Sequence, residues 1–68
     1  MVSQEYVLDQ IKKNPGITTA EMARSAPPSN LRYYAVRSSV YSKCNRLRKH
    51  GIIKGENDGM DMRWWVVE

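Results

Sequence analysis

The first part of the chain repeats apolar residues at helical spacing. Val7, Leu8 and Ile11 fall on one side of a helix among polar residues, which predicts an amphipathic helix from residue 3 to about 13. The Asn-Pro-Gly sequence at 14–16 ends this helix, because proline disfavours helical geometry in the residue before it and glycine permits a turn. One face of the helix is therefore expected to lie in the core.

A capping box marks the start of a second helix. The Thr18 hydroxyl can accept a hydrogen bond from the amide of Glu21, whose carboxylate can accept one from the amide of Thr18. Ile17 and Met22 flank this cap at the spacing of a hydrophobic staple. Both features predict a short helix over 19–25, and the two prolines that follow it are expected to end it.

A stripe of four apolar residues predicts a third helix that ends at Gly51. Leu31 would point away from this stripe if the helix ran back unbroken, so we expect an irregular turn or a kink near 34–36. The alternative is a continuous helix from Asn30, with Leu31 and the nearby tyrosines covering another surface. The residues of the stripe are Val36, Val40, Cys44 and Leu47.

Two extended runs joined by a turn predict a β-hairpin over 52–67. Ile52 and Ile53 begin the first run, and Asp58-Gly59 is typical of a hairpin turn. The return run alternates, so we expect one set of side chains to face the helices and the other, including Trp65, to face solvent. The opposite register, which would bury Trp65, is the alternative. The set expected to face the helices is Met60, Met62, Trp64 and Val66.

The charges along the chain are strongly segregated. The sequence carries 11 Lys and Arg against 7 Asp and Glu, a formal net charge of +4, and every acid lies at or before residue 21 or at or after residue 56. Clustered basic side chains without interleaved acids favour phosphate contacts, so the middle segment is expected to bind a polyanion. The alternative is a solvated basic face. The basic residues of this segment are Arg24, Arg32, Arg37, Lys43, Arg46, Arg48, Lys49 and Lys54.

Length and composition limit the classes of function. A chain of 68 residues with 41% hydrophobic content is expected to form one small domain, 1–68, with no room for a deep active site. Cys44 is the single cysteine and His50 the single histidine, which excludes an internal disulfide and a Cys/His zinc finger. Without a glycine-rich phosphate loop or a nucleophile motif, we expect no enzyme, cofactor, metal or small-molecule substrate. The chain also lacks a membrane-spanning run and a signal-peptide pattern, so a cytoplasmic location is expected.

Three helices followed by a hairpin, with the third helix the most basic, resemble the winged helix-turn-helix superfamily. The stretches that carry the resemblance are PGITTAEMA at 15–23 and VYSKCNRLRKHGII at 40–53. The resemblance implies an α+β, mainly α fold with a C-terminal two-stranded hairpin as the wing. It also implies sequence-specific binding to double-stranded DNA by a nucleoid-associated transcriptional regulator of a bacterium, an archaeon or a virus, with a helix over about 36–49 in the major groove. The link at 26–35 is longer than the usual turn of about three to four residues.

The polar face of the third helix presents residue types that read DNA. Asn can pair bidentately with adenine, Arg and Lys pair with guanine, and Ser hydroxyls can contact bases or phosphates. In the hairpin, basic side chains can contact phosphates, while acids near its tip disfavour deep entry into a groove. The candidate DNA-binding residues of the helix are Arg37, Ser38, Ser39, Tyr41, Ser42, Asn45, Arg46, Arg48 and Lys49, and those of the wing are Lys54 and Arg63.

A different class of function fits the same fold. A winged-helix domain can serve as a protein-protein interaction module within a larger assembly, and Trp65 and Val67, if exposed, favour a protein partner. A homodimer formed through the hairpin or the first helix would leave both basic helices free, about one DNA turn apart. Binding to single strands is the least favoured, since Tyr33, Tyr34 and Tyr41 are expected in a loop and a helix and not on an open sheet.

Overall fold

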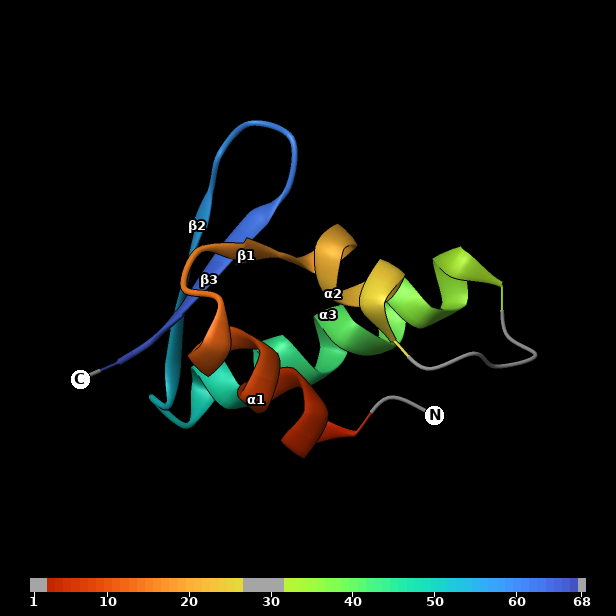
Figure 1. Cartoon of the computed structure of the whole chain (residues 1–68). Helices are drawn as coiled ribbons and strands as arrows, with labels where there is room; N and C mark the ends of the chain where they lie inside the picture. The colour runs from red at the N-terminus through yellow and green to blue at the C-terminus, as the bar shows by residue number, and fades with distance from the viewer. Residues whose placement is uncertain (1–2, 27–31, 68) are drawn as a thin grey trace.

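In the described part of the chain, three helices and a three-stranded antiparallel sheet enclose one hydrophobic core (Figure 1). The structure is a computed structural model, and it describes residues 3–26 and 32–67. The fold is therefore α+β and mostly helical, as the sequence predicts. The elements in chain order are α1 (Gln4–Lys13), β1 (Ile17–Thr18), α2 (Thr19–Ser25), α3 (Tyr33–Lys49), β2 (Ile53–Asn57) and β3 (Met62–Val66).

The first two helices begin at side-chain caps. The Ser3 hydroxyl accepts from the Tyr6 amide at 3.0 Å at the start of α1. At the start of α2, the Thr18 hydroxyl accepts from the Glu21 amide at 3.1 Å, and the Glu21 carboxylate accepts from the Thr18 amide at 3.4 Å. The capping box is confirmed, and so are the predicted ranges of both helices. The proline pair expected to end α2 lies outside the described residues.

The third helix runs unbroken from Tyr33 to Lys49, so the kink expected near 34–36 is wrong. An unbroken helix already buries Val36, Val40, Cys44 and Leu47 on one side, and a kink would gain no further burial. Tyr33 and Tyr34 lie in the first turn of this helix and not in a loop. Leu31, on which the expectation of a kink depended, lies outside the described residues.

The sheet contains one strand more than the predicted two-stranded hairpin. Its order is β1-β3-β2, and the short strand β1 pairs Ile17 with Trp64 and Thr18 with Arg63. Thr18 is the N-cap of α2, and a capping residue has extended backbone geometry. The residues before the helix are therefore in position to pair with β3, but two residues are too few to show an alternating pattern in the sequence.

The hairpin pairs Ile53 with Val66 at its base and Asn57 with Met62 at its far end. The four residues between the strands form the turn, where the Asp58 amide donates to the Asp61 carbonyl at 3.0 Å. Met60 lies in this turn and is 94% exposed, so the expectation that it packs against the helices is wrong. β3 begins only at Met62, so the alternation of side chains between the two faces of the sheet does not extend back to Met60.

Two neighbouring tryptophans lie on opposite faces of the sheet. Trp64 is fully buried among the helices, as predicted, and its indole nitrogen donates to the Thr19 hydroxyl at 3.0 Å. Trp65 is half-buried and does not face open solvent, because its ring covers Gly16 from the other side. A Cβ added at Gly16 would lie 3.4 Å from the Trp65 ring, an ordinary contact distance, but the φ of +85° at this position favours glycine.

Candidate nucleic-acid interface

The outward face of α3 carries a shallow hollow opposite the buried stripe. Ser42, Asn45, Arg46 and Lys49 line it. Residues three, four and seven positions apart lie on one face of a helix, which explains why these four side chains meet. Asn45 is half-buried, whereas the other three are exposed. The hollow therefore combines an amide, a hydroxyl and two cations within one small area.

The charge around this hollow is uniformly positive along the helix. α3 contains no acidic residue. Arg46, Arg48 and Lys49 occupy its last turn, where cations also interact favourably with the helix dipole. All three side chains are exposed, so they are available to an anionic partner as well. Ser38 is exposed on the earlier part of the helix, and Ser39 is half-buried.

Two predicted site residues of α3 already have partners within the protein. Arg37 forms an ion pair with Asp61, with 3.3 Å between a guanidinium nitrogen and a carboxylate oxygen. Tyr41 packs edge-to-face against the buried Trp64, with ring centroids 6.2 Å apart. These contacts tie one flank of the helix to the sheet. The two side chains are therefore less free to contact DNA than the residues of the hollow.

The structure does not bring the predicted hairpin residues to the hollow. Arg63 forms an ion pair with Asp58 at 2.9 Å and donates to the Gly16 carbonyl at 3.0 Å. Lys54 lies on β2 opposite Trp65 and lines a different surface. The candidate interface therefore reduces to α3.

Sequence reasoning missed the role of Asp61. Its carboxylate accepts hydrogen bonds from the amides of Ala20 at 2.9 Å and Met62 at 2.7 Å, in addition to its ion pair with Arg37. One side chain thus joins the start of α2, the flank of α3 and the base of the hairpin turn. Ala20 is 41 residues away in the chain, and no local pattern in the sequence reveals such a contact.

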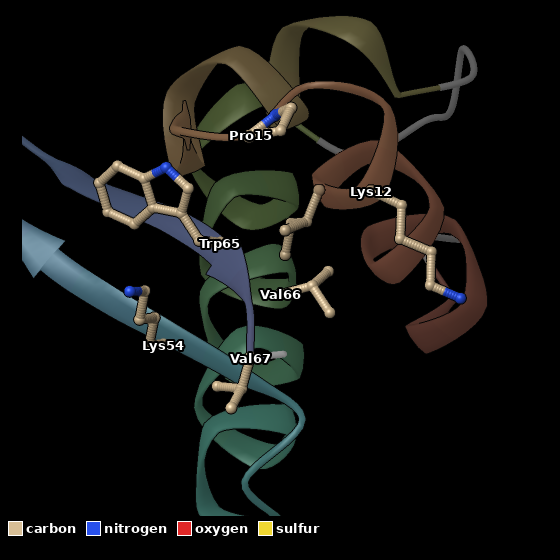
Figure 2. Close-up of a pocket in the computed structure, with 7 residues that line it drawn as sticks. Lys12, Pro15, Lys54, Trp65, Val66 and Val67 are labelled. Carbon is tan, nitrogen blue, oxygen red and sulfur yellow. The ribbon is translucent and has the colours of Figure 1, made fainter.

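A second hollow, which we call the Trp65 groove, lies between the sheet and α1. Figure 2 shows Trp65 and Lys54 on the sheet side of this groove and Lys12 on the α1 side. The exposed Val67 continues the apolar surface along the chain from Trp65. The groove shares no residue with the hollow on α3. Its lining residues are Ile11, Lys12, Pro15, Lys54, Trp65, Val66 and Val67.

The remaining reactive side chains belong to the core or to helix ends. Cys44 is fully buried, and burial, with a smaller contribution from the Asp61 carboxylate, raises the pKa of its thiol to about 12. The thiol therefore stays protonated at neutral pH and cannot act as a thiolate nucleophile. The His50 amide donates to carbonyls at the end of α3, and its side chain is exposed.

The part of the chain that the structure describes has neither a metal-binding cluster nor a helix that could span a membrane. Within residues 3–26 and 32–67, no three His, Cys, Asp or Glu side chains come together as a metal site requires. The helices in these ranges are too short or too polar to span a membrane.

Comparisons of the chain with protein-family models, with curated proteins and with solved structures gave no match.

Proposed function

We propose that this chain is a small winged-helix transcriptional regulator that binds double-stranded DNA in a sequence-specific manner, with α3 as its recognition helix. The observation that carries the proposal is the hollow on α3, where Ser42, Asn45, Arg46 and Lys49 meet on a helix without acids. These side chains supply both phosphate-binding cations and groups that can read base edges.

The dimensions and the support of α3 fit this role. A helix with its side chains is about 10–12 Å across, which matches a major groove about 12 Å wide. The opposite side of α3 is buried by α1, α2 and the sheet. The helix is therefore held in place by its packed side, which gives its outward face a defined orientation.

The arrangement of the hairpin also supports the proposal. The hairpin projects away from the helices (Figure 1), as a wing does, and β1 adds only two residues, which pair with Arg63 and Trp64 of β3. Because the charged groups of Arg63 are already paired, we assign most of the binding free energy to α3. The hairpin then has a minor part in DNA binding.

A salt-dependent titration tests the proposal. A fluorescently labelled duplex of random sequence is titrated with the protein at about 50 mM and about 200 mM salt, because released counterions make DNA affinity fall steeply with salt. Anisotropy of the labelled DNA is preferable to tryptophan fluorescence, since Trp64 is buried and Trp65 lies in a different groove. We expect binding at low salt that weakens strongly at high salt.

A matched pair of variants locates the binding surface. Lys49→Ala should weaken binding and lower the salt slope by about one. Lys13→Ala removes the same charge from an exposed position on α1 and should have a much smaller effect. Lack of binding by the folded protein at low salt, or equal losses from the two variants, would contradict the proposal.

Protein association is the second candidate function. The Trp65 groove favours it, because the groove combines an apolar floor with two lysines and lies apart from α3. A folded protein without affinity for DNA would make association the leading candidate.

A further inference from the structure

We propose that this chain associates with itself head to tail, with the hairpin tip of one copy seated in the Trp65 groove of the next. The hairpin tip is defined as residues 56–60. The inference concerns a different surface from α3 and does not depend on DNA binding. It rests on the exposure of Met60, on the chemistry of the groove and on the positions of the two surfaces.

The hairpin tip presents an apolar side chain that packs on nothing in its own molecule. Met60 is 94% exposed, more than any other large hydrophobic residue that the structure describes as exposed. Local hydrogen bonds hold it in this position, because the Asp58 carboxylate accepts from the amides of Met60 and Asp61 at 3.0 and 2.8 Å. A flexible thioether on an ordered turn is suited to fill an apolar hollow on another protein.

The charge of the hairpin tip opposes contact with DNA. Glu56 is exposed on β2, and Asp58 retains partial exposure beside its ion pair with Arg63. Hydrogen bonds from the amides of Asp61 and Met60 hold the pKa of Asp58 below its usual value of 3.8, so this carboxylate is ionised at neutral pH. Arg63 offsets much of the charge of Asp58, whereas Glu56 forms no ion pair with the residues that the structure describes, so its carboxylate would repel phosphates and favour a basic site.

The Trp65 groove has the complementary chemistry. Its floor is apolar, and the charged groups among the described residues that line it are Lys12 and Lys54. A methionine sulfur packs favourably against an aromatic ring, and Trp65 offers one face of its indole to the groove (Figure 2). The acids of the tip would then lie near the two lysines.

The positions of the two surfaces make the contact intermolecular. Lys54 and Trp65 pair near the base of the hairpin, whereas Met60 lies in the turn beyond its far end. The far end of the hairpin projects away from the helices (Figure 1). A copy therefore cannot place its tip in its own groove. A contact between two different surfaces is heterologous, so it builds an open chain or a ring and not a closed two-fold dimer.

Sedimentation equilibrium of the full chain without DNA tests this inference. We expect the average mass of the wild-type protein to rise above the monomer mass with concentration, and the rise to weaken with added salt. Met60→Asn removes the apolar anchor and Lys54→Glu reverses a charge of the groove. Each variant should weaken association by about tenfold or more, as expected when burial of one large apolar side chain or a complementary charge is lost.

A mixture of the two variants distinguishes the head-to-tail contact from a symmetric one. The Met60→Asn protein keeps an intact groove and the Lys54→Glu protein keeps an intact tip, so an equimolar mixture should form a one-to-one dimer and nothing larger. Arg24→Glu, an exposed charge reversal on α2, is the control and should associate like the wild type. Both altered side chains are exposed, so circular dichroism should show unchanged folding.

Three results would overturn the inference. The first is a wild-type protein that stays monomeric up to about 1 mM, where even weak contacts are populated. The second is association of either variant as strong as that of the wild type. The third is a mixture that remains monomeric although the wild type associates, because a head-to-tail contact requires only the intact groove of one variant and the intact tip of the other.

Discussion

At the scale of single residues, Asp61 connects several elements of the fold through its carboxylate. Its carboxylate caps α2 through the Ala20 amide, pairs with Arg37 and is 11% exposed. We expect Asp61→Ala to lower the free energy of unfolding by about 1–3 kcal/mol, because it removes a cap and leaves the amide and the guanidinium without their acceptor. Urea unfolding followed by circular dichroism measures this change. Asp61→Asn keeps one of the two acceptor oxygens and should cost less, whereas equal losses from both variants would show that the charge matters most.

Cys44 supplies a second prediction at this scale. Burial and, to a smaller extent, the Asp61 carboxylate raise the pKa of its thiol from 9.0 to about 12. The thiol ionises less readily in the folded state than in the unfolded state. Its contribution to stability is therefore complete below pH 9 and is lost as the pH rises through about 12. We expect the native thiol to be inert toward a disulfide reagent at pH 8 and to react in urea. Rapid reaction of the native protein would contradict the burial of this residue.

Individual side chains are also where the sequence predicts least. The buried positions of Trp64 and Cys44 follow from periodicity. Periodicity does not predict the ion pair between Arg37 and Asp61 or the contact between Trp65 and Gly16, because the two residues of each pair lie far apart in the chain. Residue type and helical face therefore select Arg37 as a candidate binding residue, although its guanidinium is paired with Asp61 in the structure.

At the scale of elements, the helices were predictable because their ends carry local signals. Ser3, the Thr18 capping box and Gly51, whose φ of +74° suits glycine, mark boundaries that depend on neighbours in the chain. β1 has no such signal, since it is a strand only because β3 lies beside it. The start of α3 was also mispredicted, because the expectation of a kink rested on Leu31 alone.

Different side chains of α3 are proposed to contact bases and phosphates, and this difference can be tested. Under the proposed function, Asn45 and Arg46 supply groups that can pair with base edges, whereas Lys49 supplies a cation suited to phosphates. Asn45→Ala or Arg46→Ala should reduce the preference for a selected site over random DNA by about 1–3 kcal/mol each. Lys49→Ala should weaken binding to the selected site and to random DNA by similar factors. Competition titrations measure the ratio of these two affinities, and equal effects from all three variants would indicate binding without sequence preference.

At the scale of the whole molecule, the net charge of +4 is unevenly distributed between a basic surface and an acidic one. The acid-free α3 presents a basic face, while the acids of the hairpin lie at its projecting tip. The Trp65 groove lies apart from both. Under the two proposals, one molecule contacts DNA through α3 and neighbouring copies through its hairpin tip and its Trp65 groove.

A titration of the ¹⁵N-labelled protein with duplex DNA, followed by NMR, locates the binding surface residue by residue. We predict that the amide signals of Ser42, Asn45, Arg46 and Lys49 shift most at low salt and return as salt is added. Signals of Lys54 and Trp65 should move little. Shifts confined to the Trp65 groove, or no shifts at all at low salt, would contradict the assignment of α3 as the DNA-binding element.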